Sequence, residues 1–292
     1  MEYIESILPG GYLDDDGKLH QQVSLYPLRG AEEKLIAQKG RTSQAALVTT
    51  VLSQCIRRIG TIDDVTEEIV RNLLVGDRQV LLLKLREITF GQRIQAVINC
   101  SWPDCGKQLD IDFSTENIPV TRSLQKQRFY EMTLSEQAGH KAVTFRLPNG
   151  HDQERIAHLV EQNKTLAEDL LLSQCIQSIG PLSLPEIENI AALPALAKTE
   201  IEQEMDRLAP KVSLTMEAFC PECERKFSAD FDLQEFILRE LHTQLDLIFK
   251  EVHYLAYHYH WSEKDILGMT RENRRRYIEI LSDEIERINH AT

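Results

Sequence analysis

The chain has 292 residues, of which 42% are hydrophobic and 27% charged, as in an ordinary folded protein. At about 150 residues per domain, this length predicts roughly two domains. There are 33 Lys and Arg residues against 46 Asp and Glu residues, so the formal net charge is −13. This acidic surplus argues against wrapping a nucleic-acid backbone or binding an anionic membrane, because both need cationic side chains. The apolar content also argues against a disordered chain, because it is sufficient to form a core.

The first residues carry no sign of a secretory signal. Residues 1–6 contain neither a basic segment nor an apolar run. The densest apolar stretch, residues 80–83, is followed by Lys84 and is far shorter than the roughly 18 residues that a membrane helix needs. We therefore expect a protein that stays in the cytosol where it is made. In that reducing compartment, its six cysteines are expected to be thiols or metal ligands rather than disulfides.

The sequence contains an internal duplication. Residues 52–60 (LSQCIRRIG) recur as residues 172–180 (LSQCIQSIG), with seven of nine positions identical at an offset of 120, which also relates Gly30 to Gly150. The six cysteines form three related pairs, namely Cys55 with Cys175, Cys100 with Cys220 and, at an offset of 118, Cys105 with Cys223. One offset held over such a length predicts two copies of one folding unit.

The predicted elements of the first copy begin with a turn and a strand. Residues 14–17 (DDDG) indicate a hairpin turn, because no Glu follows at the spacing of a calcium loop. Alternation at 22–26 predicts a strand, and the apolar spacing of 47–59 predicts an amphipathic helix with Gly60 as its C-cap. Thr66 is expected to cap a further helix. The remaining elements are a break at Gly76-Asp77, a restarted helix over residues 78–87, and strands over residues 92–98 and 107–113.

The second copy has the same predicted order. Its elements are a strand at 142–146, a helix at 171–179 capped by Gly180, a helix opened by Ser183 and Pro185 and interrupted by Pro194, and strands at 212–218 and 226–231. Each copy therefore ends in a β-hairpin that carries a cysteine pair.

From Leu233 onward the pattern changes to a helical tail, which has no counterpart in the first copy. Its apolar stripe consists of Leu238, Leu241, Leu245, Ile248, Val252, Leu255 and Ala256. Ser262 is expected to start a second helix of the tail, and Thr270 can cap a last one. We predict an α+β fold made of a duplicated helix-plus-β-hairpin repeat. The expected domains are repeat 1 (residues 1–120), repeat 2 (residues 121–235) and a C-terminal helical arm (residues 236–292).

Two of the cysteine pairs have the spacing of metal ligands. They are Cys100 with Cys105 (C-x4-C) and Cys220 with Cys223 (C-x2-C). Each lies between two predicted strands, as in a zinc knuckle, which is a hairpin tip that carries metal-binding cysteines. A structural zinc ion needs four ligands, so we predict that the two copies meet and share one zinc site. Two unligated hairpin tips and a redox pair remain as alternatives. Cys55 and Cys175 lie on apolar helix faces and are expected to be core residues.

No catalytic constellation is evident. The chain has no phosphate-loop, dinucleotide-binding or zinc-protease motif and no nucleophile elbow. His258 and His260 are two residues apart and cannot share a helix face, so with His253 they are interpreted as an aromatic packing or docking surface. Residues 274–276 (RRR) are interpreted as a solvated charged face, with salt bridges to a partner as the alternative. We therefore expect a protein that is not an enzyme and has no small-molecule substrate.

Four segments of the first copy carry a family resemblance. They are residues 7–12 (ILPGGY), 23–33 (VSLYPLRGAEE), 74–78 (LVGDR) and 85–91 (LREITFG), the last leading into the Cys100–Cys105 pair. Together they resemble the T4-type baseplate protein family, whose members are hub-assembly components of contractile phage tails and of phage-tail-like contractile injection systems. The resemblance covers residues 7–113 well and the second copy more faintly.

The resemblance implies a structural or assembly role. The expected partners are hub, spike or tape-measure proteins, or the chaperone of the tape measure, met in the bacterial cytoplasm during assembly. Retention in the finished particle is left open. The second copy has residues 195–198 (ALAK) where the first has its Gly-Asp-Arg turn, so any partner contact of that turn would belong to the first copy.

The alternative function is a zinc-ribbon regulatory or nucleic-acid-binding module. Zinc knuckles are common in such proteins, but these usually present a basic face. The net charge of −13 argues against it.

Overall fold

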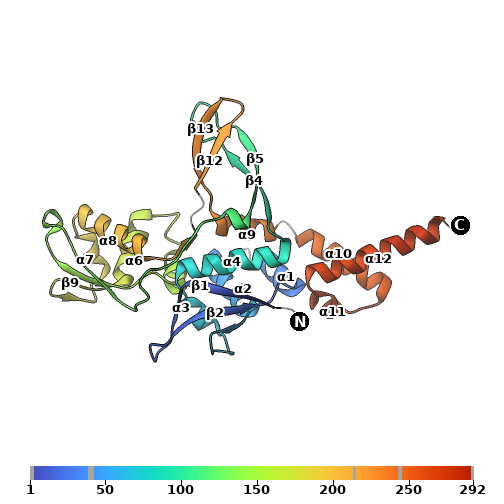
Figure 1. The fold of residues 1–292 in the computed structure, drawn as a ribbon, viewed down its shortest axis with the longest axis horizontal. Helices are drawn as coiled ribbons and strands as arrows, with labels where there is room; N and C mark the ends of the chain where they lie inside the picture. Colours follow the sequence, from blue (N-terminus) through green and yellow to red (C-terminus); the bar gives the residue numbers. More distant parts are fainter. Residues whose placement is uncertain (1–2, 39–42, 213–214, 243–244, 291–292) are drawn as a thin grey trace.

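The computed structural model describes residues 3–38, 43–212, 215–242 and 245–290. Within these ranges the molecule is elongated, with the second half at one end, the first half in the middle and the C-terminal helices at the other end (Figure 1). Two β-hairpins project together from the middle (Figure 1). The strand pairings of the described residues are all antiparallel. The mixture of helices and separate sheets confirms the α+β class.

The first half is built on a three-stranded sheet in the order β1-β2-β3. Its elements are β1 (Ile4–Leu13), β2 (Leu19–Leu25), α1 (Gly30–Gln38), α2 (Gln44–Cys55), β3 (Ile56–Ile59), α3 (Glu67–Asn72), α4 (Val75–Phe90), β4 (Arg93–Asn99) and β5 (Gln108–Ser114). The turn after β1 forms as predicted, because the Asp14 carboxylate accepts the Lys18 N–H and Gly17 has a φ of +78°. Buried apolar side chains of the sheet, α2 and α4 form one core.

The helix predicted to reach Ile59 ends at Cys55, so this prediction is wrong for its last four residues. The next four residues form β3, which buries Ile56 and Ile59 and exposes Arg57. A spacing of three does not fit a regular strand, but the pairing with β2 has a register irregularity between Ser24 and Leu25, and β-branched isoleucines favour a strand. Gly60 is therefore no helix cap, but a turn residue after β3 with a φ of +57°.

The helix break predicted at Gly76-Asp77 is also wrong. Thr66 caps α3 as expected, but the chain is extended at Leu73 and Leu74, and both Gly76 and Asp77 lie in the first turn of α4. Gly76 serves a close approach instead, because a Cβ there would lie 1.8 Å from the Pro210 carbonyl oxygen. The Gly-Asp-Arg segment is thus buried inside the molecule and forms no exposed turn.

The second half carries a four-stranded sheet in the order β10-β9-β8-β7 and a core of its own. Its elements are β6 (Val120–Thr121), β7 (Tyr130–Thr133), β8 (Ala142–Phe145), α5 (Gly150–Ile156), α6 (Lys164–Cys175), β9 (Ile176–Ile179), β10 (Leu182–Ser183), α7 (Ile187–Ala191), α8 (Ala195–Leu208), β11 (Lys211–Val212), β12 (Thr215–Cys220) and β13 (Arg225–Asp230), with short 3-10 turns at Thr115–Asn117 and Glu136–Ala138. β6 and β11 pair where the chain passes between the halves.

The second half repeats the differences seen in the first. α6 ends at Cys175, and Gly180 follows strand β9 with a φ of +56°, so it caps no helix. Ser183 lies in β10 and opens no helix, whereas Pro194 interrupts the helical stretch as predicted, directly before α8. Ser213 and Leu214 of the predicted strand 212–218 lie outside the described residues.

The two sheets share their register at an offset of 120. The corresponding Cα pairs are Val23↔Ile59 with Val143↔Ile179, Ser24↔Arg58 with Thr144↔Ser178, and Leu25↔Ile56 with Phe145↔Ile176. Both ladders have an irregularity before the last of these pairs. The backbone of the two halves therefore agrees in detail along these strands.

The described residues of the tail are mainly helical. The helices are α9 (Leu233–His242), α10 (Leu245–Tyr259), α11 (Glu263–Leu267) and α12 (Arg271–His290). Ser262 and Thr270 accept the N–H groups of Asp265 and Asn273, as expected of helix caps. The side chains of Leu241 and Leu245 lie outside the described residues.

α9 does not extend away from the body. Leu233, Phe236, Ile237 and Leu238 are buried in the core of the first half. The limits at residues 120 and 235 stay a prediction.

The interpretation of residues 274–276 as a solvated face is wrong at Arg274. This side chain is fully buried, and it forms ion pairs of 2.8 Å with Glu33 of α1 and Glu251 of α10. Arg275 and Arg276 are exposed. Successive residues of a helix point about 100° apart, so one of three consecutive side chains can face the body of the protein while its neighbours face solvent.

Candidate metal centre

The two cysteine-bearing hairpins, β4–β5 and β12–β13, stand side by side (Figure 1). In β4, burial alternates strictly, so that Ile94, Ala96 and Ile98 point inward. Near the hairpin tips, Ile98 and Phe227 pack against each other's hairpin in a small apolar cluster of their own. Hydrophobic burial between the hairpins thus brings together two tips that are more than 100 residues apart in sequence.

The four predicted ligands meet at these tips. The Sγ atoms of Cys100 and Cys223 are 3.8 Å apart, and those of Cys105 and Cys220 are 3.7 Å apart. All four sulfur atoms lie within 4.8 Å of one another. These distances are far longer than a disulfide bond of about 2.0 Å. The two cross-hairpin distances are nearly equal, and each hairpin supplies two sulfur atoms to the cluster.

The backbone of each tip curls around its cysteine pair. Gly106 follows the second cysteine of the first tip with a φ of +58°, and Glu224 follows that of the second tip with a φ of +55°. The Cys100 N–H donates to the Lys107 carbonyl, and the Glu224 N–H donates to the Cys220 carbonyl. Because a left-handed conformation is unfavourable for glutamate, the second tip holds this shape against a local cost.

Further contacts tie the tips together. The Trp102 indole N–H donates to the Lys226 carbonyl of the other hairpin at 3.1 Å. The Arg225 guanidinium stacks on Trp102, 4.5 Å from the ring centre, and pairs with Asp104 at 2.7 Å. These contacts were not predicted from the sequence. Trp102 and Asp104 in one knuckle and Arg225 in the other are nevertheless a pattern from which a contact between the tips could have been expected.

The thiols differ in their surroundings. Burial raises the pKa of the Cys100 thiol to about 12. Burial opposes ionisation of Cys223 too, but hydrogen bonds from the side chain and backbone of Arg225 outweigh it and lower the pKa of Cys223 to about 7. The cluster therefore has one thiol that is poised to ionise and to act as a ligand near neutral pH.

The donor set fits a tetrahedral thiophilic metal ion. Sulfur ligands at about 2.3 Å from a tetrahedral zinc ion are about 3.8 Å apart, which matches the two cross-hairpin distances. Cys100 and Cys220 are buried, while Cys105 and Cys223 are half-buried. Four sulfur donors in a closed site leave no open coordination position, which is typical of a structural metal centre. The four cysteines lie close together and can bind a metal ion.

The other candidates from the sequence lie elsewhere. Cys55 and Cys175 are buried in the two cores, and burial raises the pKa of both thiols, as expected of core residues. The predicted aromatic surface exists on α10: Tyr257 and His258 pack edge to face, 5.0 Å between ring centres. Tyr257 is 69% exposed, so this surface is open.

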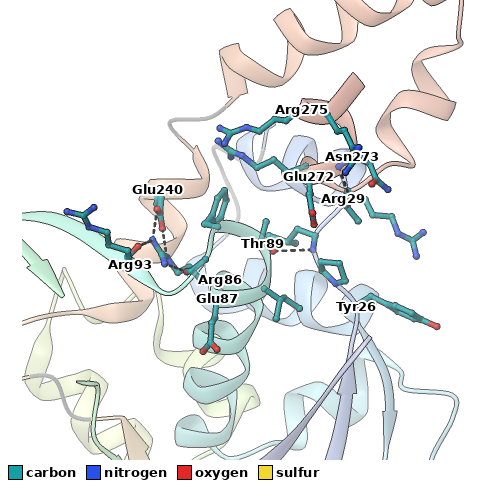
Figure 2. Close-up of a pocket in the computed structure, with 18 of the residues that line it drawn as sticks. Tyr26, Arg29, Arg86, Glu87, Thr89, Arg93, Glu240, Glu272, Asn273 and Arg275 are labelled. Carbon is teal, nitrogen blue, oxygen red and sulfur yellow. Dashed lines mark hydrogen bonds and ion pairs between the residues drawn. The ribbon is translucent and has the colours of Figure 1, made fainter. Parts of the chain in front are cut away.

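A polar groove of about 1020 Å³ lies between the end of α4, the start of β4 and the first turns of α12 (Figure 2). Its charged lining residues are Arg29, Arg86, Arg93, Arg271, Arg275, Arg276, Glu87, Glu240, Glu272 and Glu279. Arg86 is almost fully buried and pairs with Glu240 of α9 at 3.0 Å. No histidine, cysteine or serine is among the described lining residues. The groove thus suits recognition of charged groups.

Comparison with known proteins identifies the family. A family model described as "T4 bacteriophage base plate protein" matches residues 12–238, more than half of the chain. The chain belongs to the T4 bacteriophage base plate protein family. A second model, described as "Family of unknown function (DUF6760)", matches residues 240–292. No curated protein and no solved structure was found to match.

Membership in the base plate family confirms the predicted resemblance and extends it through the second half. The family supports a structural role in a phage baseplate, which implies interaction with other tail proteins. Among the described residues, no helix is both long and apolar enough to cross a membrane.

Proposed function

We propose that this protein is a non-enzymatic assembly component of a contractile-tail or injection-system baseplate. It binds hub, spike or tape-measure proteins, or the chaperone of the tape measure, in the bacterial cytoplasm. Partners are proteins rather than nucleic acid, membranes or small molecules, because the net charge of −13 repels phosphate backbones and anionic lipids. The base plate family match over residues 12–238 is the observation that carries this proposal.

We infer that the two halves are copies of one unit, joined by a shared structural zinc ion. The common register of the two sheets at an offset of 120 supports the duplication. The approach of Cys100 to Cys223 and of Cys105 to Cys220 supports the zinc site. Metal binding there would contribute directly to the folding free energy and hold the hairpins as one rigid projection.

Metal analysis with cysteine variants tests the shared site. The wild-type chain is expected to hold about one zinc ion. A Cys220→Ser/Cys223→Ser variant should lose it, and Cys100 and Cys105 should then react with thiol reagents. The matched control, Cys55→Ala/Cys175→Ala, removes the same number of cysteines outside the cluster and should keep the zinc ion. If Cys100 and Cys105 stay protected in the serine variant, the shared site is wrong.

Deletion of the gene tests the role in assembly. Particles should fail to assemble, and the purified chain should form a complex with a purified hub, spike or tape-measure protein. Assembled particles that still contract without the protein would contradict the proposal. Binding of duplex or single-stranded DNA at low salt would instead favour the nucleic-acid alternative.

A further inference from the structure

Two helical corners of this chain are built alike, although they lie 196 residues apart. The corner of α3 and α4 begins at Thr66, whose carbonyl accepts the Val70 N–H at 3.2 Å. The corner of α11 and α12 begins at Ser262, whose carbonyl accepts the Ile266 N–H at 3.1 Å. Val70 and Ile266 are both fully buried. The two corners thus start with the same cap and the same apolar anchor.

The match continues through the bend. The Leu73 N–H donates to the Val70 carbonyl, and the Met269 N–H donates to the Ile266 carbonyl. The second helix of each corner begins two residues later, α4 at Val75 and α12 at Arg271. The hydrogen-bonded residues and the helix starts therefore have the same spacing in sequence in both corners.

Each corner holds the first residue of a helix that begins with glycine. The Gly150 N–H of α5 donates to the Leu73 carbonyl at 3.2 Å, and the Gly30 N–H of α1 donates to the Met269 carbonyl at 3.2 Å. The residues just before these glycines form isolated antiparallel bridges with the corners, Asn149 with Leu74 and Arg29 with Thr270. Gly30 and Gly150 are related by the offset of 120.

At each of these two corners, the glycine at the helix start lies close to a buried arginine side chain. Arg78 of the first corner is 1% exposed and Arg274 of the tail corner is 0% exposed. A Cβ at Gly150 would lie 2.2 Å from Nη1 of Arg78, and a Cβ at Gly30 would lie 3.1 Å from Nη1 of Arg274. Only glycine lets the start of α5 approach Arg78 so closely. The start of α1 approaches Arg274 less closely, and the atom nearest to a Cβ at Gly30 would be Cδ2 of Leu267 at 2.9 Å.

The helix that precedes each corner, α2 or α10, also makes matching contacts. α2 contacts α3, α4 and α5, and α10 contacts α11, α12 and α1. The tail therefore meets the first half as the first half meets the second. The tail also coincides with a family model of its own over residues 240–292, so this segment is a recognisable unit apart from the base plate region.

The corner of α7 and α8 is an internal control. Its counterpart of Arg78 is Lys198, whose ammonium group pairs with Asp169 of its own half at 2.5 Å. No glycine-initiated helix sits on this corner among the described residues, and Leu196 is 44% exposed. The corners that hold such a helix are those with a buried arginine.

We propose that the start of α1, with Gly30 and Glu33, is a binding site for an arginine-bearing helical corner. The segment of residues 245–290 fills this site within the chain. A separate protein that presents the same corner, with a Ser or Thr cap, an apolar anchor and an arginine spaced as Ser262, Ile266 and Arg274, would fill it in trans. This site goes beyond the proposed function and stands whether or not the baseplate role or the zinc site holds.

Cleavage of the full chain tests the site. A protease site is inserted between residues 243 and 244, and the folded protein is then cut. We expect residues 1–243 and 244–292 to remain together on size-exclusion chromatography. When one cut sample with a fluorescent tail is mixed with a second whose body carries an affinity tag, the fluorescent tail should appear on the tagged body.

Variants locate the contact. Arg274→Leu should weaken retention of the cut tail by about 100-fold or more, because it leaves buried carboxylates unpaired. Glu33→Gln should weaken it less, from the α1 side. The matched control is Arg275→Leu, one residue on and exposed, which should have little effect. Separation of the wild-type pieces on cutting, absence of transfer between samples, or equal effects of Arg274→Leu and Arg275→Leu would each overturn the proposal.

Discussion

The junction between the halves and the junction with the tail each bury an arginine at the equivalent position of a helical corner, Arg78 and Arg274. The two junctions stabilise the charge of that arginine in different ways. Within the described part of the chain, Arg78 donates to neutral oxygens, those of Thr49, Val70 and Ala45. Burial accordingly lowers the pKa of Arg78 to about 10. Arg274 is buried as deeply, and it pairs with the carboxylates of Glu33 and Glu251.

The pKa values follow this difference. Burial alone would lower the pKa of Arg274, but the two carboxylates outweigh it and raise that pKa. The junction between the halves therefore depends on hydrogen bonding and close packing around a lone charge. The junction with the tail depends on a buried ion-pair network, where loss of one member leaves the others uncompensated.

The largest effect is expected from Arg274→Leu. Its removal breaks the ion pairs of the buried Glu33 and Glu251 and leaves Arg271 as a nearby cation, which should cost about 3–5 kcal/mol at neutral pH. Because α1 and the tail part first, the loss is best measured as faster hydrogen exchange of the amides in α1 and α12. An effect no larger than that of Arg78→Leu would contradict the contrast between the junctions.

Arg78→Leu should have a smaller effect, about 1–3 kcal/mol, measured by denaturant unfolding. It removes three hydrogen bonds to neutral oxygens. The Val70 and Ala45 carbonyls keep other donors, the Leu73 N–H and the Thr49 hydroxyl, and no opposite charge is stranded. It also removes a buried charge that lacks a direct carboxylate partner, which offsets part of the loss. A cost above that of Arg274→Leu would show that Arg78 is neutralised by a charge, such as that of Glu154, more strongly than its contacts suggest.

The sequence predicted what depends on repetition and spacing. The strand at 22–26 and the four clustered cysteines follow from patterns that recur in both halves of the sequence, whereas the helix cap at Thr66 and the break before α8 follow from local signals in one half. The offsets of 120 and 118 also aligned the cysteine pairs, which made a single joint cluster the economical expectation.

The sequence did not predict what depends on contacts between distant segments. Gly76 has the pattern of a helix breaker, yet it lies in α4 because the Pro210 carbonyl occupies the place of its side chain. Arg274 has the pattern of a surface charge, yet Glu33 lies opposite it, 241 residues earlier. Residues 56–59 have helical spacing, and only pairing with β2 makes them a strand. Each outcome was decided by a partner that local periodicity cannot reveal.

The glycines that start α5 and α1 should respond unequally to alanine. Gly150→Ala places a methyl group 2.2 Å from Arg78, whereas Gly30→Ala places one 3.1 Å from Arg274. We expect a loss of about 1–3 kcal/mol for Gly150→Ala, because overpacking forces the junction apart, and less for Gly30→Ala. Thermal unfolding measures both. The control is Gly268→Ala, where the nearest atoms are carbonyl oxygens at 3.3 Å. Equal losses at the two helix starts would mean that the close approach to Arg78 is unimportant.

The smallest effect concerns pH and Asp77, the neighbour of Arg78. Burial raises the pKa of Asp77 from its ordinary 3.8 to about 7, although its Oδ1 accepts the Gly10 N–H at 2.7 Å. Its other carboxylate oxygen has no hydrogen-bond partner among the described residues. A carboxyl group whose pKa is raised by folding contributes stability that is fully present below the unfolded pKa of 3.8. This contribution is lost as the pH rises from there through the folded pKa of about 7, above which both states are ionised.

Wild-type stability should therefore fall by about 1 kcal/mol between pH 6 and pH 8, as one proton is released on passing a pKa near 7. Asp77→Asn keeps an oxygen for the Gly10 N–H and removes the titration, so it should flatten this slope. Denaturant unfolding of both proteins at pH 6, 7 and 8 measures the difference. The comparison variant is Asp112→Asn, whose carboxyl group has a lowered pKa beside Arg93 and should leave the slope between pH 6 and 8 unchanged. If Asp77→Asn keeps the wild-type slope, Asp77 is ionised in the folded protein throughout this range, and its charge must be compensated across the junction by a cation such as Lys126. In that case the junction between the halves would resemble the tail junction more closely than the contacts of Arg78 indicate.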